Sequence, residues 1–322
     1  MSYYKLEDKI NEINSFAEHG HKDAKSTGIA SLDGYVALKK GYPLYVGGAP
    51  HAGKSEFVME LLVNTSILYN WKHFIYCGES GNEEHVYYEL LSKYLSRPYK
   101  YAEEKDRVLA QAFISEHFVV VNQNQEYSID SFNQAIDEAE NELHIKFDTV
   151  MFDPFNDLED ERSKHGGRDD KFLSDVLKKT RINSAIKNRI DILVTHIADV
   201  RAVKDDDTGR FYMRPALPNE WAGGRAWWRR AFTMIMIYRP PSFLTDENGK
   251  PYEENESHVY IQKSKPKGIG KLGIRPIFWD YKKNRYYSYS ESGQMLYSCE
   301  TEKSVEKLEP NLDFENEFDI PF

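Results

Sequence analysis

One short segment constrains this chain more than any other. Residues 48–55 have the sequence GAPHAGKS, a complete G-x-x-x-x-G-K-[ST] motif. Its two glycines let successive backbone N–H groups point inward at a phosphate, and a following helix adds its positive N-terminal end. The motif needs a strand before it and a helix after it. Residues 42–47 are typical of a short buried strand, and residues 56–69 carry apolar side chains at helical spacing, which favours a phosphate-binding loop over a glycine-rich turn.

The last two residues of this loop have distinct expected roles. Lys54 is placed to reach the β- and γ-phosphates of a nucleoside triphosphate, and Ser55 is placed to bind Mg²⁺. The motif therefore predicts ATP and Mg²⁺ as ligands. The candidate nucleotide-binding residues are Gly48, Ala49, Pro50, His51, Ala52, Gly53, Lys54 and Ser55.

The rest of the chain predicts an α/β fold, with a mostly parallel twisted sheet flanked by helices. Its 322 residues suffice for one such domain with a large core. From about residue 27, strand-like and helix-like segments alternate, as a mostly parallel sheet requires. Strands are expected over 73–77, 118–121, 149–153, 190–196, 233–238 and 259–261, helices over 82–96, 129–143 and 170–188, and an antiparallel finish over 274–288.

Two segments flank the predicted core of residues 26–298. Residues 1–25 are expected to form an amphipathic helical arm, which either packs on its own domain or docks on a neighbouring subunit. Residues 299–322 are predicted to be an acidic, disordered tail with an apolar tip. The apolar positions of the arm are Leu6, Ile10, Ile13 and Phe16.

Composition narrows the expected compartment and partners. The two cysteines form no C-x-x-C pair, no apolar run is long enough to span a membrane, and the first residues are too polar for a signal peptide. These features predict a cytoplasmic protein without a membrane partner. The net charge of −10 argues against a surface that coats nucleic acid, whereas the basic cluster over residues 225–230 is compatible with a local site.

Two acidic residues follow expected strands and are candidates for the chemistry. Asp153 closes an apolar strand, where an acid can hold Mg²⁺ near the phosphates. Glu79 follows the strand over 73–77, where a carboxylate can orient the attacking water as a general base. The alternatives are a strand-end turn residue for Asp153 and a solvated loop acid for Glu79.

The order of these elements resembles that of a known class. Residues 27–33, TGIASLD, are similar to a segment that precedes the phosphate loop in RecA-like hexameric replicative helicases. This class includes the DnaB helicases, the mitochondrial Twinkle helicase and the phage primase-helicases. The resemblance covers about residues 25–290 and implies a RecA-like ATPase core that assembles as a hexameric ring. We expect no primase or zinc-binding segment ahead of it, since residues 1–25 are too short for one.

The resemblance also implies roles for single residues. Lys54, Glu79 and His196 fall where the class has catalytic groups, with Glu79 as the catalytic glutamate and His196 as a sensor of the γ-phosphate. Ser55 and Asp153 fall where it has the residues that hold Mg²⁺.

One position departs from the class. Where its members carry Lys-x-Arg near the end of the core, with the arginine acting on the neighbour's ATP, this chain has Lys263 and Lys265 around a serine. Lysine supplies charge without the planar fork of arginine, so any action of these two residues on a neighbouring site should be weaker or arranged differently.

A second departure concerns DNA. Residues 215–224, PALPNEWAGG, resemble the DNA-facing second loop of the class, but alanine replaces the usual basic residue before the glycines. Basic residues follow instead, interleaved with Trp227 and Trp228, of which at least one is expected to belong to the core. Arginine and exposed aromatic side chains suit single-stranded DNA. The candidate DNA-binding residues are Arg225, Arg229 and Arg230.

The end of the sequence resembles another family. Acidic residues followed by Asp319, Ile320, Pro321 and Phe322 are similar to the tip of bacterial single-stranded-DNA-binding proteins. This resemblance implies that a replication protein recognises the tip, whereas the alternative is a solubilising tail.

Two functional hypotheses follow. The first is an ATP-dependent DNA helicase or translocase that acts on single-stranded DNA in phage replication. The second is a nucleotide-gated DNA-binding protein, a helicase loader or recombination mediator, without processive unwinding. Glu79 and His196 favour the first, and the lysines at 263 and 265 favour the second.

Overall fold

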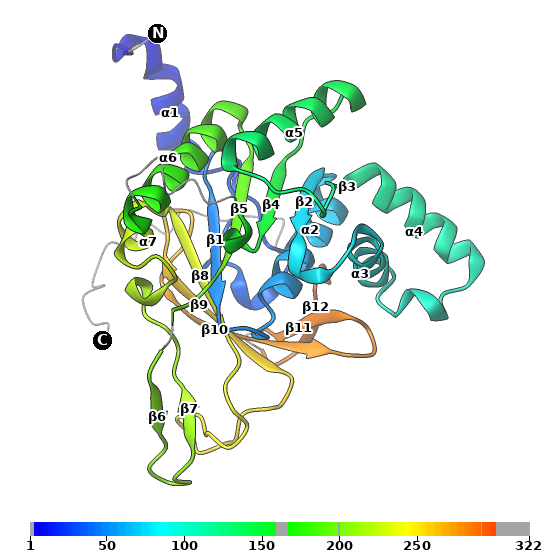
Figure 1. Ribbon diagram of the computed structural model, residues 1–322, viewed down its shortest axis with the longest axis vertical. Coiled ribbons are helices and arrows are strands. Elements are labelled where there is room, and N and C mark those ends of the chain that lie inside the picture. Colours follow the sequence, from blue (N-terminus) through cyan, green and yellow to red (C-terminus); the bar gives the residue numbers. More distant parts are fainter. Residues whose placement is uncertain (1–2, 159–166, 199, 291, 301–322) are drawn as a thin grey trace.

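A twisted sheet of ten strands organises the molecule (Figure 1). The computed structural model describes residues 3–158, 167–198, 200–290 and 292–300. The strands are β1 (Leu44–Gly48), β2 (His73–Cys77), β3 (Phe118–Val120), β4 (Thr149–Asp153), β5 (Ile190–His196), β6 (Ala202–Lys204), β7 (Phe211–Met213), β8 (Thr233–Tyr238), β9 (Glu256–Lys263), β10 (Gly273–Asp280), β11 (Arg285–Tyr289) and β12 (Met295–Tyr297). The α-helices are α1 (Ile10–His19), α2 (Lys54–Tyr69), α3 (Glu83–Leu95), α4 (Glu104–His117), α5 (Ile129–Leu143), α6 (Asp169–Lys187) and α7 (Arg225–Arg230).

The sheet has a parallel and an antiparallel part. Its order is β12-β11-β10-β9-β8-β1-β5-β4-β2-β3, in which the strands from β8 to β3 are parallel and β9 to β12 are antiparallel. Gly48 pairs with His196, and Cys77 pairs with Asp153. The ends of four parallel strands therefore share one edge, and the predicted α/β fold with a mostly parallel sheet is confirmed.

Helices cover both faces of the parallel part, because each strand alternates its side chains between two cores (Figure 1). On β1, Val46 belongs to the same buried cluster as Phe57 of α2 and Val86 of α3, whereas Tyr45 belongs to the cluster that includes Phe132 of α5 and Leu173 of α6. The helix after the phosphate loop is thus fixed against the sheet along its length.

Several elements differ from the expected ones. Helix α4 and the hairpin of β6 and β7 were not expected, since the first is strongly charged and the second has strands of only three residues. Helix α2 begins at Lys54 rather than at residue 56. Cys299, placed in the tail by the sequence, donates its backbone N–H to the Gly28 carbonyl, and almost all of the remaining tail lies outside the described residues.

The N-terminal arm projects from the body of the molecule (Figure 1). Helix α1 begins at Ile10, later than the apolar pattern indicates, and none of its side chains is buried. Within the described part of the chain, the apolar stripe stays largely exposed: Leu6 65%, Ile10 42%, Ile13 45% and Phe16 52%. The arm therefore does not bury this stripe on its own described domain.

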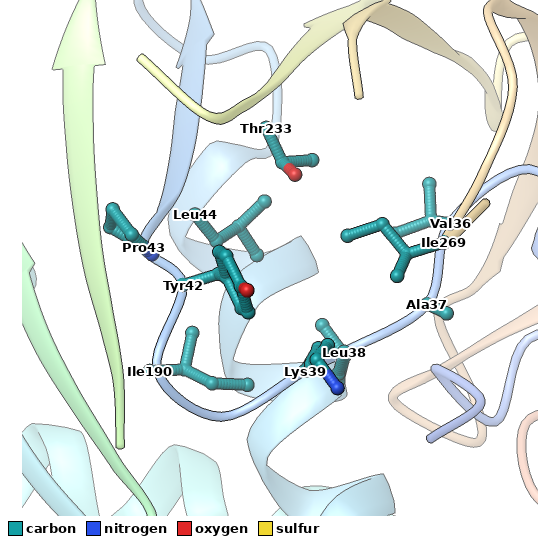
Figure 2. A pocket seen from close by; sticks show the side chains of 10 residues that line it. All are labelled: Val36, Ala37, Leu38, Lys39, Tyr42, Pro43, Leu44, Ile190, Thr233 and Ile269. Atoms are coloured by element: carbon teal, nitrogen blue, oxygen red, sulfur yellow. The ribbon is translucent and has the colours of Figure 1, made fainter. Parts of the chain in front are cut away.

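The opposite edge of the sheet carries a small hollow. It is lined where β1, β5 and β8 begin, by Leu44, Ile190 and Thr233 among others (Figure 2). This mostly apolar lining distinguishes it from the edge that carries the phosphate loop. None of the helices that the structure describes is both long and apolar enough to cross a bilayer.

Candidate nucleotide site

The phosphate loop connects β1 to α2 and requires both of its glycines. A Cβ atom on Gly48 would lie 2.6 Å from the backbone oxygen of Ile237 on β8, so no larger residue fits there. Gly53 has a φ of +90°, in the region that favours glycine. The local sequence therefore creates a concave backbone at the start of a helix, which suits an anion.

Lys54 lies at the first position of α2 and is buried. Its Nζ atom donates to the backbone oxygen of Ala49 at 3.1 Å and lies 3.3 Å from His196 Nδ1. Burial lowers the pKa of Lys54, and the carboxylates of Asp153 and Glu79 act in the opposite direction. The ammonium group thus lies across the loop, where it can contact phosphates.

Asp153 ends β4 and is completely buried. Its Oδ2 atom lies 3.7 Å from the Cys77 sulfur, and Oδ1 has no hydrogen-bond partner among the described residues. Burial raises the pKa of Asp153 to about 6, although a hydrogen bond from Ser55 and the charge of Lys54 counteract this rise. A buried carboxylate oxygen without a partner, beside a serine hydroxyl, is a donor set that fits Mg²⁺.

Glu79 and His196 meet although they are 117 residues apart in the chain. Glu79 lies in the turn after β2, and His196 is the last residue of β5. His196 Nε2 is 2.9 Å from Glu79 Oε1, while its Nδ1 faces Lys54. The structure therefore places the three predicted catalytic residues in one continuous chain of contacts.

The candidate DNA-binding arginines lie on α7. Arg225, Arg229 and Arg230 are exposed, so they are free to meet a ligand from solvent. Trp227 is completely buried, whereas Trp228 is 44% exposed. The prediction that at least one of the two tryptophans belongs to the core is confirmed.

The sequence did not indicate a role for Trp221, which joins the loop of residues 215–224 to the nucleotide site. A Cβ atom on Gly47 of β1 would lie 2.9 Å from the Trp221 ring, so the indole packs directly on the strand before the phosphate loop. Its Nε1 atom donates to Gln262 at 2.9 Å. The only sequence signal for this packing was a large aromatic residue in one segment and the small residues Gly47 and Gly48 in another.

Lys263 contacts α7 of its own chain. Its Nζ atom donates to the Trp228 backbone oxygen and lies 5.3 Å from the centre of the Trp228 ring. Burial, together with the nearby charge of Lys265, lowers the pKa of Lys263 to about 8. Lys265 is exposed. The action of both residues on a neighbouring subunit stays a prediction.

The hairpin of β6 and β7 was also not predicted from the sequence. It follows His196 along the chain and extends beyond the sheet (Figure 1). Phe211 is 69% exposed and Met213 43%, and Lys204 is exposed beside them. The available signal was the turn-forming sequence DDDTG between two short segments that contain basic and apolar residues.

The predicted tip residues Asp319–Phe322 lie outside the described residues.

Together, the sheet order and the phosphate loop define a RecA-like P-loop fold. In a comparison with solved structures, one described as an ATPase domain has a TM-score of 0.68 at 13% identity, covering 90% of this chain and 100% of that chain. A second structure, described as that of a DnaB-like replicative helicase and its interactions with primase, has a TM-score of 0.64 at 15% identity, covering 88% of this chain and 67% of that one. The fold is thus that of DnaB-like ATPase domains.

Among curated proteins, the chain is similar to "Twinkle homolog protein, chloroplastic/mitochondrial" of Arabidopsis thaliana. The two are 24% identical over 195 residues, which are 56% of this chain and 27% of the plant protein. The chain therefore matches only about a quarter of that relative's length. No protein-family model matches the chain.

Proposed function

We propose that this protein is an ATP-dependent DNA helicase or translocase that acts on single-stranded DNA in replication. The observation that carries the proposal is the convergence of Lys54, His196 and Glu79 beside the buried carboxylate of Asp153. The structural likeness to a DnaB-like replicative helicase and the sequence likeness to a Twinkle homologue favour a motor on DNA over other P-loop functions.

The chain's own residues support ATP hydrolysis. Lys54 would place its charge on the β- and γ-phosphates, and Glu79 would orient the attacking water and accept its proton. His196 would hold the Glu79 carboxylate at 2.9 Å from its Nε2 atom and report on the γ-phosphate. Ser55 and Asp153 would hold Mg²⁺, which neutralises phosphate charge when bound.

Two exposed surfaces would bind single-stranded DNA. Arg225, Arg229 and Arg230 would meet phosphates, and the outward face of the β6–β7 hairpin offers Phe211 to a base and Lys204 to the backbone. Such pairing of cations with exposed aromatic rings suits single strands, because every base has a face on which it can stack.

A ring of subunits, a hexamer in DnaB-like helicases, would complete this arrangement. Helix α1 leaves its apolar stripe exposed, which favours the hypothesis of an arm that docks on a neighbouring subunit. Lys263 and Lys265 would act on the neighbour's ATP across the same interface. The tip residues Asp319–Phe322 would bind a replication protein, a proposal that depends on their sequence alone.

One observation favours the second candidate function, a nucleotide-gated DNA-binding or loader protein. Lys263 contacts Trp228 of its own chain, and a lysine engaged in this way is less available to a neighbouring active site. Such a protein would bind ATP and DNA without processive unwinding.

The test combines turnover with assembly. ATP hydrolysis is measured with and without single-stranded DNA, mass photometry gives the oligomer formed on forked DNA with ATP, and the same sample is tested for strand separation. The motor proposal expects that DNA stimulates ATP turnover and that the protein separates the strands. Both activities should be lost in Lys54→Ala. DNA binding gated by ATP without strand separation would identify the loader, and the absence of both ATP turnover and DNA binding would overturn both.

A further inference from the structure

The β6–β7 hairpin has two different faces. Val203 pairs with Tyr212 between the pairs Ala202 with Met213 and Lys204 with Phe211. Since successive strand residues point to opposite faces, Tyr212 lies on the face away from Phe211. The face with Lys204, Phe211 and Met213 is exposed to solvent, and the other face carries the partly buried Tyr212.

The face that carries Tyr212 contacts the connection between β8 and β9. The ring of Phe243 in this connection lies 6.4 Å from the Tyr212 ring at an interplanar angle of 78°, an edge-to-face arrangement. The Arg210 guanidinium lies 5.3 Å from the centre of the same ring. Both geometries fall within the range of attractive aromatic contacts. A single side chain thus receives two side chains of the hairpin.

The connection itself is anchored near the nucleotide site. Its first residue, Arg239, donates to the hydroxyl of Tyr281 at 3.4 Å. Thr245 pairs with Pro251, and the Tyr252 N–H donates to the Leu244 backbone oxygen at 3.1 Å, which closes the connection on itself. The preceding strand, β8, carries the Ile237 oxygen that packs against Gly48. Phe243 is thus presented by a braced segment.

The hairpin has another support at its base. Arg214, just after β7, forms a two-pronged ion pair with Glu220, with N–O distances of 2.6 and 2.8 Å. This pair holds the end of the hairpin that joins the domain, whereas Phe243 contacts Arg210 and Tyr212, closer to the turn. The hairpin is therefore held at two places, by the Arg214–Glu220 ion pair at its base and by Phe243 closer to its turn.

We propose that Phe243 is a positioning residue that orients the β6–β7 hairpin, so that its outward face, with Lys204 and Phe211, is presented to single-stranded DNA. The DNA role rests on the proposed function, whereas the orienting contact does not. The inference assigns to the β8–β9 connection the coupling between the orientation of the hairpin and its affinity for DNA.

The experiment compares four variants of the full chain. Phe243→Ala removes the ring, Phe243→Tyr restores it, Ser242→Ala changes an exposed neighbour in the same connection, and Phe211→Ala alters the outward face. Trypsin cleavage after Arg210 without DNA reports the orientation of the hairpin. Fluorescence anisotropy with a labelled single strand reports DNA affinity, and basal ATP hydrolysis reports the nucleotide site.

The proposal expects Phe243→Ala to be cleaved about fivefold faster, as the loss of an edge-to-face contact together with a cation–π contact implies. Its DNA affinity should fall by a similar factor while basal hydrolysis is unchanged. Phe243→Tyr and Ser242→Ala should match the parent, and Phe211→Ala should lose DNA affinity with unchanged cleavage.

The two proposals fail in distinguishable ways. Unchanged cleavage in Phe243→Ala overturns the positioning role, whatever the DNA result. Faster cleavage in a protein whose parent form binds no single-stranded DNA retains the orienting contact but overturns both the DNA-binding function and the coupling inferred from it. Faster cleavage with unchanged DNA affinity overturns the coupling alone.

Discussion

Helix α2 takes part in two buried polar clusters that differ in one respect. At its start, Lys54 faces Asp153, and two turns later Glu60 meets Arg285 of β11 and Lys93 of α3. Glu60 accepts from Arg285 Nε at 2.7 Å and from Lys93 Nζ at 3.3 Å. In this second cluster every carboxylate oxygen of Glu60 has a partner from the chain itself.

The pKa values reflect the difference. Burial by itself would raise the pKa of Glu60, yet the charges of Arg285 and Lys93 hold it below its ordinary value. Burial raises the pKa of Asp153 to about 6, because the nearby Lys54 only partly compensates for the lost water. A buried charge that the chain itself neutralises serves the fold, whereas one that it leaves incomplete is suited to a ligand.

The largest effect should be the loss of ATP hydrolysis when Glu79 of the nucleotide site is replaced. Glu79→Gln keeps the shape of the side chain but removes the base, so ATP hydrolysis should fall by about 10²–10⁴-fold. ATP binding and the unfolding midpoint should be retained, since Glu79 is partly exposed and contacts His196 only at the site. Steady-state turnover and nucleotide titration check this. Parental turnover would return Glu79 to the role of a solvated loop acid.

Replacing Glu60, in the cluster with Lys93 and Arg285, should instead lower stability. Glu60→Gln leaves Arg285 buried without its carboxylate and Lys93 with Glu56 as its remaining acidic partner, which should lower the free energy of unfolding by about 3–5 kcal/mol. Urea denaturation measures the change. The control is Glu12→Gln on α1, which breaks an exposed ion pair with Lys9 and should leave the midpoint unchanged. Equal midpoints for parent and Glu60→Gln would contradict the distinction between the clusters.

Asp153→Asn should raise the free energy of unfolding, whereas Glu60→Gln should lower it. The folded protein binds the Asp153 proton more tightly than the unfolded chain, so the stability linked to this proton is lost as the pH rises from about 4 through 6. At pH 8 without Mg²⁺, the amide avoids the buried charge and should raise the free energy of unfolding by up to about 3 kcal/mol. The gain should shrink below pH 5. Thermal unfolding in EDTA at both pH values is the measurement, and a destabilised variant at pH 8 would refute the argument.

The smallest effects should come from the surface. Arg225 and Arg229 form no ion pair within the part of the chain that the structure describes, so they too are available to a ligand. Replacing each with alanine should lower the slope of log K against log salt for single-stranded DNA by about 0.7. Arg97→Ala is the matched control, because Arg97 already pairs with Asp106 at 2.6 Å. Slopes equal to the parent's in both α7 variants would exclude phosphate contacts there.

Local pattern was sufficient for much of the fold. The phosphate loop is set by glycine conformation and a short motif, so residues 48–55 predicted its place between β1 and α2. Strands β2, β4, β5 and β8 were predicted with their bounds, since buried parallel strands are continuous apolar runs. Where such runs are short or charged, as in the β6–β7 hairpin and α4, the local signal was too weak.

Only the tertiary structure decided which side chains meet. The sequence named Lys54 and His196, which lie 142 residues apart, but their contact depends on β5 pairing with β1 in a register that places His196 opposite Gly48. The same holds for Phe243 and Tyr212, which no local pattern joins. The sequence by itself thus determined the elements and the chemistry each one carries, because these depend on neighbouring residues, whereas strand order and register determined the partners.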